Sequence, residues 1–146
     1  MGYQSFLEYW DDVRAQIINS KQTSLIGIRP SVNNKDKHKG LISGRIAFKN
    51  GATLEVTEAV NLDPLTGEAI PELYNFHFAD KDQSFLFRYD MDIPASRNKQ
   101  GKPIISHPPH HLHVVNRKDV RYITHRTNLI EIYNFIIETF INKPAS

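Results

Sequence analysis

The sequence predicts an α+β protein, with a mainly antiparallel sheet of about five or six strands and N- and C-terminal helices packed against it. Three observations support this prediction. Apolar residues recur at helical spacing near both ends of the chain, the segments between them are rich in strand-forming residues, and their connections are short. Short connections favour antiparallel neighbours, because a parallel crossover needs a dozen or more residues. The length of 146 residues suits a single domain spanning 1–146.

Composition excludes several classes of protein. Lysine and arginine total 18 against 16 acidic residues, and the net charge of +2 is too small to indicate nucleic-acid binding by itself. Without cysteine there is neither a disulfide framework nor a cysteine-ligated metal site. The chain shows no signal peptide and no apolar run long enough to span a bilayer. We therefore expect a cytoplasmic location and no membrane partner.

Both predicted helices begin with a capping signal. Ser5 is followed by Glu8, and Asn128 is followed by Glu131, each at the third position of a capping box. The apolar stripe of the first helix is Phe6, Trp10, Val13 and Ile17, and that of the last is Leu129, Ile132, Ile136 and Phe140, broadened by Tyr133 and Ile137.

The first predicted strand lies in "SLIGIRPSV" and is expected to end at its proline. The basic segment "NNKDKHKG" follows, with three lysines and no apolar residue. A charge run of this kind is usually a solvated loop. The functional alternative is a mobile basic arm that meets phosphate.

Asn50-Gly51 marks a hairpin turn between two strand-like segments. A three-residue loop over 49–51 pairs Ile46 with Leu54 and Arg45 with Glu55, which separates apolar from polar side chains on the two faces. We therefore predict this register, in which Phe48 also opposes Ala52, Gly44 opposes Val56 and Ser43 opposes Thr57.

A second hairpin is predicted in "LYNFHFADKDQSFLFRYDMD", with Lys81-Asp82 at its turn. Pairing outward from that turn brings six aromatic side chains onto one face, which must then be core. The expected pairs are Phe78 with Phe85, Phe76 with Phe87 and Tyr74 with Tyr89, and the opposite face carries Asn75, His77, Arg88 and Asp90.

Four of the seven histidines lie in the segment "HPPHHLH", residues 107–113. Its prolines exclude the interior of a helix. Side chains alternate along an extended strand, so His111 and His113 share one face while Leu112 shares the other with Val114. The direction of His110, where the chain leaves the prolines, stays open.

One interpretation of these histidines is a metal site. A His-x-His pair on a strand can hold zinc, manganese or iron, but it needs a third ligand. His77, Asp90, Glu55 and His107 are candidates for that ligand.

A second interpretation is metal-free cleavage of RNA, whose 2′-hydroxyl is a built-in nucleophile. Two histidines can divide the acid and base roles near neutral pH, and an arginine can hold the phosphate with its planar fork. On this interpretation His110, His111, His113 and Arg88 are the catalytic candidates, and His77, Asp90 and His107 contact the substrate. The plainer alternatives are exposed histidines, an Arg88–Asp90 surface ion pair and an Arg45–Glu55 cross-strand pair.

Taken together, the Asn50-Gly51 hairpin, "YNFHF…LFRYD", "PHHLHV" and a terminal helix resemble the TumE family over roughly residues 41–140. Members of that family are regarded as toxins of type II toxin–antitoxin pairs. The resemblance is carried by Tyr74 and His77 on one strand, by Phe87, Arg88, Tyr89 and Asp90 on the next, and by Pro109, His110, His111, Leu112 and His113. One departure is that "MDIPASRNKQGKP" stands where the family often has Asn-Ala-Pro-His-His.

The resemblance implies a toxin whose partners are a cognate antitoxin and an RNA substrate. We expect no cofactor, with a metal bound by His111 and His113 as the alternative. The remaining functional alternatives are a non-catalytic module that binds metal or nucleic acid, and a metal-dependent hydrolase of a small substrate.

Overall fold

The computed structural model describes residues 2–82, 85–91, 96–97, 103–104, 110–114, 117–123 and 127–141. For residues 85–86, and for the described residues between 96 and 123, the structure describes the backbone and not the side chains.

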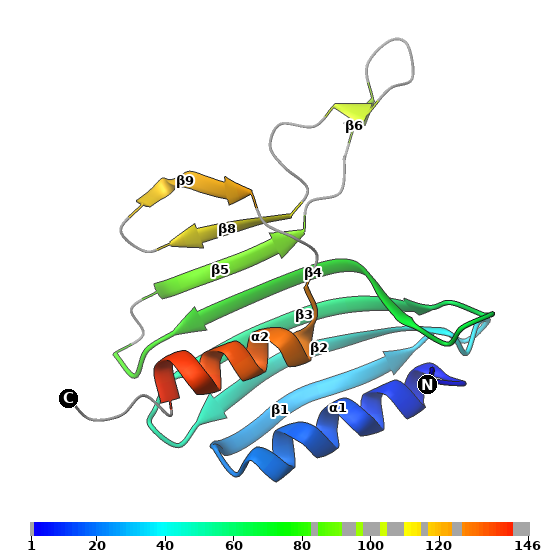
Figure 1. The fold of residues 1–146 in the computed structure, drawn as a ribbon, viewed down its shortest axis with the longest axis horizontal. Coiled ribbons are helices and arrows are strands. Elements are labelled where there is room, and N and C mark those ends of the chain that lie inside the picture. Colours follow the sequence, from blue (N-terminus) through cyan, green and yellow to red (C-terminus); the bar gives the residue numbers. More distant parts are fainter. Residues whose placement is uncertain are drawn as a thin grey trace.

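The described strands form a seven-stranded sheet in the order β1-β2-β3-β4-β5-β8-β9, and every neighbouring pair is antiparallel. A helix precedes the sheet and another follows it (Figure 1). The elements are α1 (Phe6–Ser20), β1 (Thr23–Val32), β2 (Lys39–Phe48), β3 (Thr53–Leu62), β4 (Ala69–Ala79), β5 (Phe85–Met91), β6 (Ser96–Arg97), β7 (Pro103–Ile104), β8 (His110–Val114), β9 (Arg117–Ile123), α2 (Leu129–Ile136) and a π-helical turn, η1 (Ile137–Ile141).

The α+β class, the antiparallel sheet and the two flanking helices are confirmed. The strand count differs from the prediction of about five or six. The first five strands follow one another both in the chain and in the sheet, and β8 and β9 then extend it to seven. The short strands β6 and β7 pair with each other apart from this sheet.

Both helices begin where their capping signals predicted. Ser5 Oγ accepts the backbone N–H of Glu8 at 3.3 Å, and Asn128 Oδ1 accepts that of Glu131 at 2.9 Å. The predicted stripe of α1 is buried, as are the first three residues of the α2 stripe. Phe140 is 37% exposed, because the chain leaves α-helical spacing in η1 before it reaches this residue.

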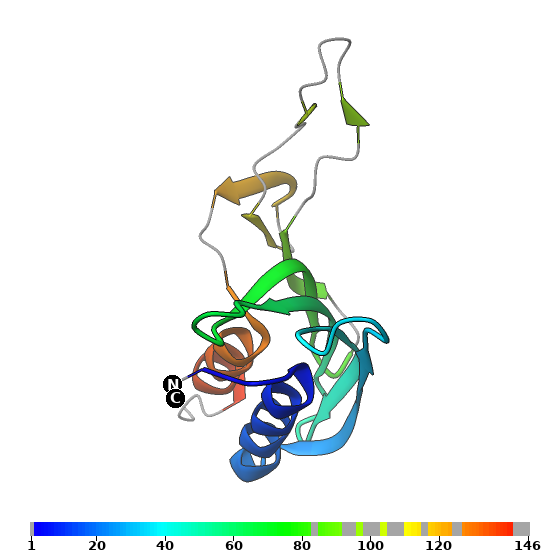
Figure 2. The same ribbon diagram turned by 90° about the vertical axis from the view of Figure 1, so that its right-hand side faces the viewer.

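The core lies between the helices and one face of the sheet (Figures 1 and 2). The residues that β2, β3 and β4 contribute to it alternate along each strand, as the pleat requires. They are Ile42, Ile46, Phe48, Leu54, Val56, Val60, Leu62, Tyr74, Phe76 and Phe78. The other face of the sheet is covered by neither helix, and we call it the open face.

The predicted register of the first hairpin is confirmed. Ile46 pairs with Leu54 and Arg45 with Glu55. Gly51 has a φ of +92°, as a left-handed loop position requires. The prediction succeeded because the three-residue loop separates apolar from polar side chains on the two faces of the hairpin.

The predicted register of the second hairpin is wrong by two residues. Phe78 pairs with Phe87 rather than with Phe85, and Phe76 pairs with Tyr89. The ladder shifts between Phe78 and Ala79, so a bulge adds length on the turn side. Because a shift by two keeps every side chain on its face, Phe76 and Phe87 are still buried, while the side chain of Phe85 lies outside the description.

Of two local expectations for the N-terminal half, the end of the first strand at its proline is wrong, whereas the solvated segment 33–40 is borne out, since none of its residues is buried. Strand β1 continues through Pro30, which pairs with Ile42. This is possible because β1 is an edge strand, where one side of the backbone needs no ladder hydrogen bond. The basic loop that follows forms a turn, since Asn33 Oδ1 accepts the N–H groups of Lys35 and Asp36 and the Lys37 carbonyl accepts the N–H of Phe6.

Glu58 is a buried carboxylate on the core face of β3, with 0% of its surface exposed. Its Oε1 accepts the hydroxyl of Tyr9 on α1 at 2.6 Å, and its Oε2 accepts the N–H of Leu129 at the start of α2 at 2.7 Å. Burial raises the pKa of Glu58, although both hydrogen bonds act in the opposite direction. One side chain thus joins the sheet to both helices.

Candidate functional site

Two neighbouring rows of polar residues cross the open face at right angles to the strands. Directly paired residues of antiparallel strands occupy the same face, so the register defines each row. The first row runs Arg45, Glu55, His77, Arg88, His113 and Arg121 from β2 to β9. The second runs Ser43, Thr57, Asn75, Asp90 and His111 from β2 to β8.

Arg88 and Asp90 form an ion pair on β5 at the centre of these rows. Arg88 Nε donates to Asp90 Oδ2 at 2.7 Å. The Asp90 side chain is only 8% exposed, whereas that of Arg88 is 42% exposed. The pair therefore differs from the exposed surface pair considered above, because a buried carboxylate orients a guanidinium group that reaches solvent.

Arg45, Glu55 and His77 form a second charged group in the same row. Arg45 Nη2 donates to Glu55 Oε1 at 2.7 Å, and Glu55 Oε2 lies 3.9 Å from His77 Nδ1. The side chains of Arg45 and Glu55 are 55% and 53% exposed, and that of His77 is 38% exposed. The carboxylate thus stands between the arginine and the imidazole, and all three reach solvent.

The histidine strand β8 pairs with β5 along this polar segment. His113 is the partner of Arg88, and His111 is the partner of Asp90. His110 pairs with Met91. Because positions alternate along a strand, that of His110 belongs to the opposite face from those of His111 and His113, the face toward the helices. The register therefore brings two of the three β8 histidines to positions beside the ion pair; His107 lies outside the described residues.

The metal interpretation gains no support among the described side chains, where no group of three His, Asp or Glu residues is arranged to hold an ion. The side chains of the β8 histidines are not among them. A site built on His111 and His113 is therefore untested.

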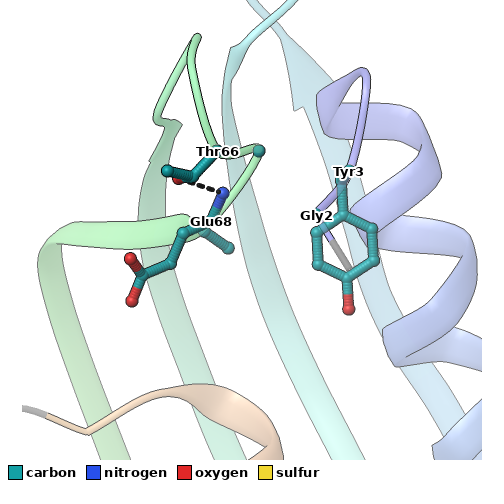
Figure 3. Close-up of a pocket in the computed structure, with 6 residues that line it drawn as sticks. Gly2, Tyr3, Thr66 and Glu68 are labelled. Atoms are coloured by element: carbon teal, nitrogen blue, oxygen red, sulfur yellow. Dashed lines mark hydrogen bonds between the residues drawn. The ribbon is translucent and has the colours of Figure 1, made fainter.

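Two surface hollows lie apart from the polar rows. One, of about 370 Å³, lies between the N-terminal segment and the β3–β4 connection, and its lining includes Tyr3, Thr66 and Glu68 (Figure 3). The other, of about 340 Å³, is lined by residues that include Phe78, Lys81 and Phe140. The residues that line the first hollow include no lysine, arginine or histidine, so neither its charge nor its position suits a phosphate.

Comparison with known proteins decides the family. The family model described as Toxin TumE matches residues 14–141. The chain belongs to the toxin TumE family. No curated protein and no solved structure matches it.

The TumE match begins within α1 and ends with η1, so it includes both polar rows and the whole of β8. The resemblance inferred from the short motifs is thereby confirmed, and the family is one of toxins. In the part of the chain that the structure describes, no helix is long and apolar enough to cross a membrane.

The sequence did not indicate two features of this region. Glu55 was expected beside Arg45, but its approach to His77 depends on the pairing of β3 with β4. Arg121 was not considered, because β9 was not recognised as a strand. The alternation of Val120 and Tyr122 with charged residues is the signal that would have indicated it.

Proposed function

We propose that this TumE-family chain is the toxin of a toxin–antitoxin pair and that it acts on RNA as a histidine-dependent ribonuclease. The observation that supports this most is the β5–β8 register, which pairs Arg88 with His113 and Asp90 with His111. Two histidines, which can move protons near neutral pH, thus lie beside an arginine, whose guanidinium group suits phosphate.

The proposed reaction uses the substrate's own 2′-hydroxyl. One histidine accepts the 2′-O–H proton while the 2′-oxygen forms a bond to phosphorus. The bond from phosphorus to the 5′-oxygen breaks, and a protonated histidine donates its proton to that oxygen. The products are a 2′,3′-cyclic phosphate and a 5′-hydroxyl, and no metal or external nucleophile is consumed.

Arg88 binds the phosphate in this scheme. Its Nε is held by Asp90, so the plane of the guanidinium group is set before the substrate arrives. A guanidinium group can donate two parallel hydrogen bonds to phosphate oxygens and offset their growing negative charge. Asp90 in this scheme orients Arg88 rather than contacting the substrate, which narrows the role expected for it from the sequence.

The alternative is a metal site on the same strand. His111 and His113 are two residues apart on β8, which is the spacing of paired imidazole ligands. A metal-dependent hydrolase, or a module that only binds metal, would use the same histidines without needing Arg88 as a phosphate ligand. A module that only binds nucleic acid would bind RNA, through Arg88 among other residues, without cleaving it. Arg88 therefore distinguishes the ribonuclease from the metal site, and cleavage distinguishes it from the nucleic-acid-binding module.

The experiment that tests the proposal is cleavage of a short RNA by purified protein. We expect products that end in 2′,3′-cyclic phosphate, and we expect the double variant His111→Ala/His113→Ala to lose about 10²- to 10⁴-fold in rate. Arg88→Ala should also be slower, while Lys37→Ala, on an exposed loop residue, serves as the matched loss of a cation.

Two results would refute the ribonuclease. One is an unchanged rate for the double variant in protein that melts like the wild type. The other is a loss in Lys37→Ala as large as that in Arg88→Ala, which would show that general positive charge matters rather than this site.

A further inference from the structure

In-line displacement at phosphorus requires the entering and leaving oxygens to lie on opposite sides of the phosphoryl group. A base and an acid that serve these oxygens must therefore approach from opposite sides of the cation that holds the phosphate. His111 and His113 both belong to β8, which borders β5 on one side alone. Assigning both proton transfers to this pair leaves the other side of Arg88 without a catalytic group.

His77 occupies that other side. It lies on β4, the second neighbour of β5, and is the direct partner of Arg88. Strands in a sheet are about 4.8 Å apart, so the positions of His77 and His113 are separated by roughly 10 Å, with Arg88 between them. The row thus has the order histidine, arginine, histidine across three adjacent strands.

Glu55 bears on the chemical state of His77. A carboxylate near Nδ1 favours the imidazole tautomer that carries its proton on Nδ1, which leaves Nε2 able to accept one. Glu55 Oε2 lies 3.9 Å from His77 Nδ1, and such contacts are often long before substrate binds. Arg45, at 2.7 Å from the other carboxylate oxygen, restrains Glu55 in this place.

We propose that His77 is the general base of the ribonuclease, that Glu55 is its positioning residue and that His113 is the general acid. This assignment rests on the proposed function and extends it. His77 Nε2 accepts the 2′-O–H proton as the 2′-oxygen attacks phosphorus. The phosphorus–5′-oxygen bond breaks on the far side of Arg88, and the departing oxygen takes its proton from His113.

A substrate with sulfur in place of the leaving 5′-oxygen tests the two roles separately. A thiol ionises at a pH of about 8.5, so the thiolate can leave without an acid. We expect His113→Ala to be slow on the normal RNA and close to wild type on the sulfur-containing RNA. His77→Gln should be slower by about 10²- to 10⁴-fold on both, because neither substrate removes the need for a base.

The chain offers a matched control in His38. Its Nδ1 lies 3.3 Å from a carboxylate oxygen of Asp36, and its side chain is 31% exposed, so it resembles the His77–Glu55 pair away from the rows. His38→Gln should cleave both substrates at the wild-type rate. Thermal melts of His77→Gln and His38→Gln, measured alongside, identify any loss that comes from unfolding.

Each outcome decides a separate point. If His77→Gln cleaves the normal RNA at the wild-type rate, His77 has no catalytic role and the inference is overturned. If His77→Gln is slow on the normal RNA but reaches the wild-type rate on the sulfur-containing RNA, His77 is not the base. If wild-type protein cuts neither RNA, or if His111→Ala/His113→Ala retains its rate, the ribonuclease proposal itself fails and the role of His77 fails with it.

The positioning of His77 by Glu55 can be measured separately, through the tautomer of the His77 ring. Nitrogen NMR of the His77 ring should show mainly the Nδ1–H tautomer in the wild type and a smaller share of it in Glu55→Ala, together with slower cleavage. An unchanged tautomer ratio would show that Glu55 does not position His77.

Discussion

Glu58 joins β3 to both helices, and replacing it should destabilise the fold strongly. Glu58→Ala removes the acceptor of the Tyr9 hydroxyl and of the Leu129 N–H, and both groups lie in a buried environment. Each unsatisfied buried group costs about 1–3 kcal/mol, so the two together cost roughly 2–6 kcal/mol. The cavity left by the side chain adds to this loss.

Glu58→Gln separates the charge from the hydrogen bonds. The amide oxygen can accept the Leu129 N–H while the amide nitrogen donates to the Tyr9 oxygen, so neither contact need be lost. The buried negative charge is removed as well, and its desolvation no longer opposes folding. We expect the glutamine variant to lie within about 1 kcal/mol of the wild type near pH 7.

The dependence on pH has a defined sign. Burial raises the pKa of Glu58, whose ordinary value is 4.5, so the folded protein holds this proton to higher pH than the unfolded chain does. The stabilisation from protonated Glu58 is therefore complete below pH 4.5 and is lost as the pH rises through the folded-state pKa. Glutamine does not titrate. The free energy of unfolding of Glu58→Gln should therefore rise relative to that of the wild type as the pH increases through this interval.

Urea denaturation followed by tryptophan fluorescence measures these differences. Trp10, on α1, is the one tryptophan of the chain and is 8% exposed, so it reports the packing that Glu58 supports. Free energies of unfolding would be compared at several pH values from 4.5 upward for the wild type and Glu58→Gln. Parallel curves for the two proteins would show that Glu58 does not titrate with a raised pKa, and full stability in Glu58→Ala would show that its two hydrogen bonds do not support the fold.

Two further predictions concern the core and the chemistry. Phe87, 5% exposed, contacts the rings of Phe78, Phe135 and Phe140, and Phe87→Ala should cost about 3–5 kcal/mol in chemical denaturation; a loss below about 1 kcal/mol would contradict the packing. RNA cleavage should persist in EDTA with no stoichiometric metal in the purified protein. About one zinc or manganese per chain, lost in His111→Ala/His113→Ala, would instead support the metal site.

The elements that the sequence predicted correctly depend on short-range signals. Ser5 and Asn128 are followed by a glutamate at the third position, and both helices begin there. The register around Gly51 follows from two short segments whose apolar residues had to meet. In each case the deciding contacts lie within about ten residues of one another, so local patterning is sufficient.

The errors arose where the outcome depends on less local features. The bulge at Phe78 changed the pairs of the second hairpin without moving any side chain to the other face, so alternation alone gave no warning. Glu58 was overlooked, although it alternates with Val56 and Val60 on the core face. Its partners come from both ends of the chain, at separations of 49 and 71 residues.

The candidate site was predictable in its residue types and only partly in its arrangement. Alternation indicated that His111 and His113 share a face, as do His77 and Arg88. It could not indicate that β8 pairs with β5, or that Glu55 approaches His77, because both facts depend on the strand order. This order is what suggests a base and an acid on opposite sides of Arg88.

The proposed function requires that the open face around Arg88 carries the toxic activity. Survival of cells that express the chain without its antitoxin tests this most directly. We expect wild-type protein to reduce colony counts and His111→Ala/His113→Ala to restore them while its melting temperature stays nearly unchanged. Full toxicity in that double variant would show that the histidine strand is not the active site.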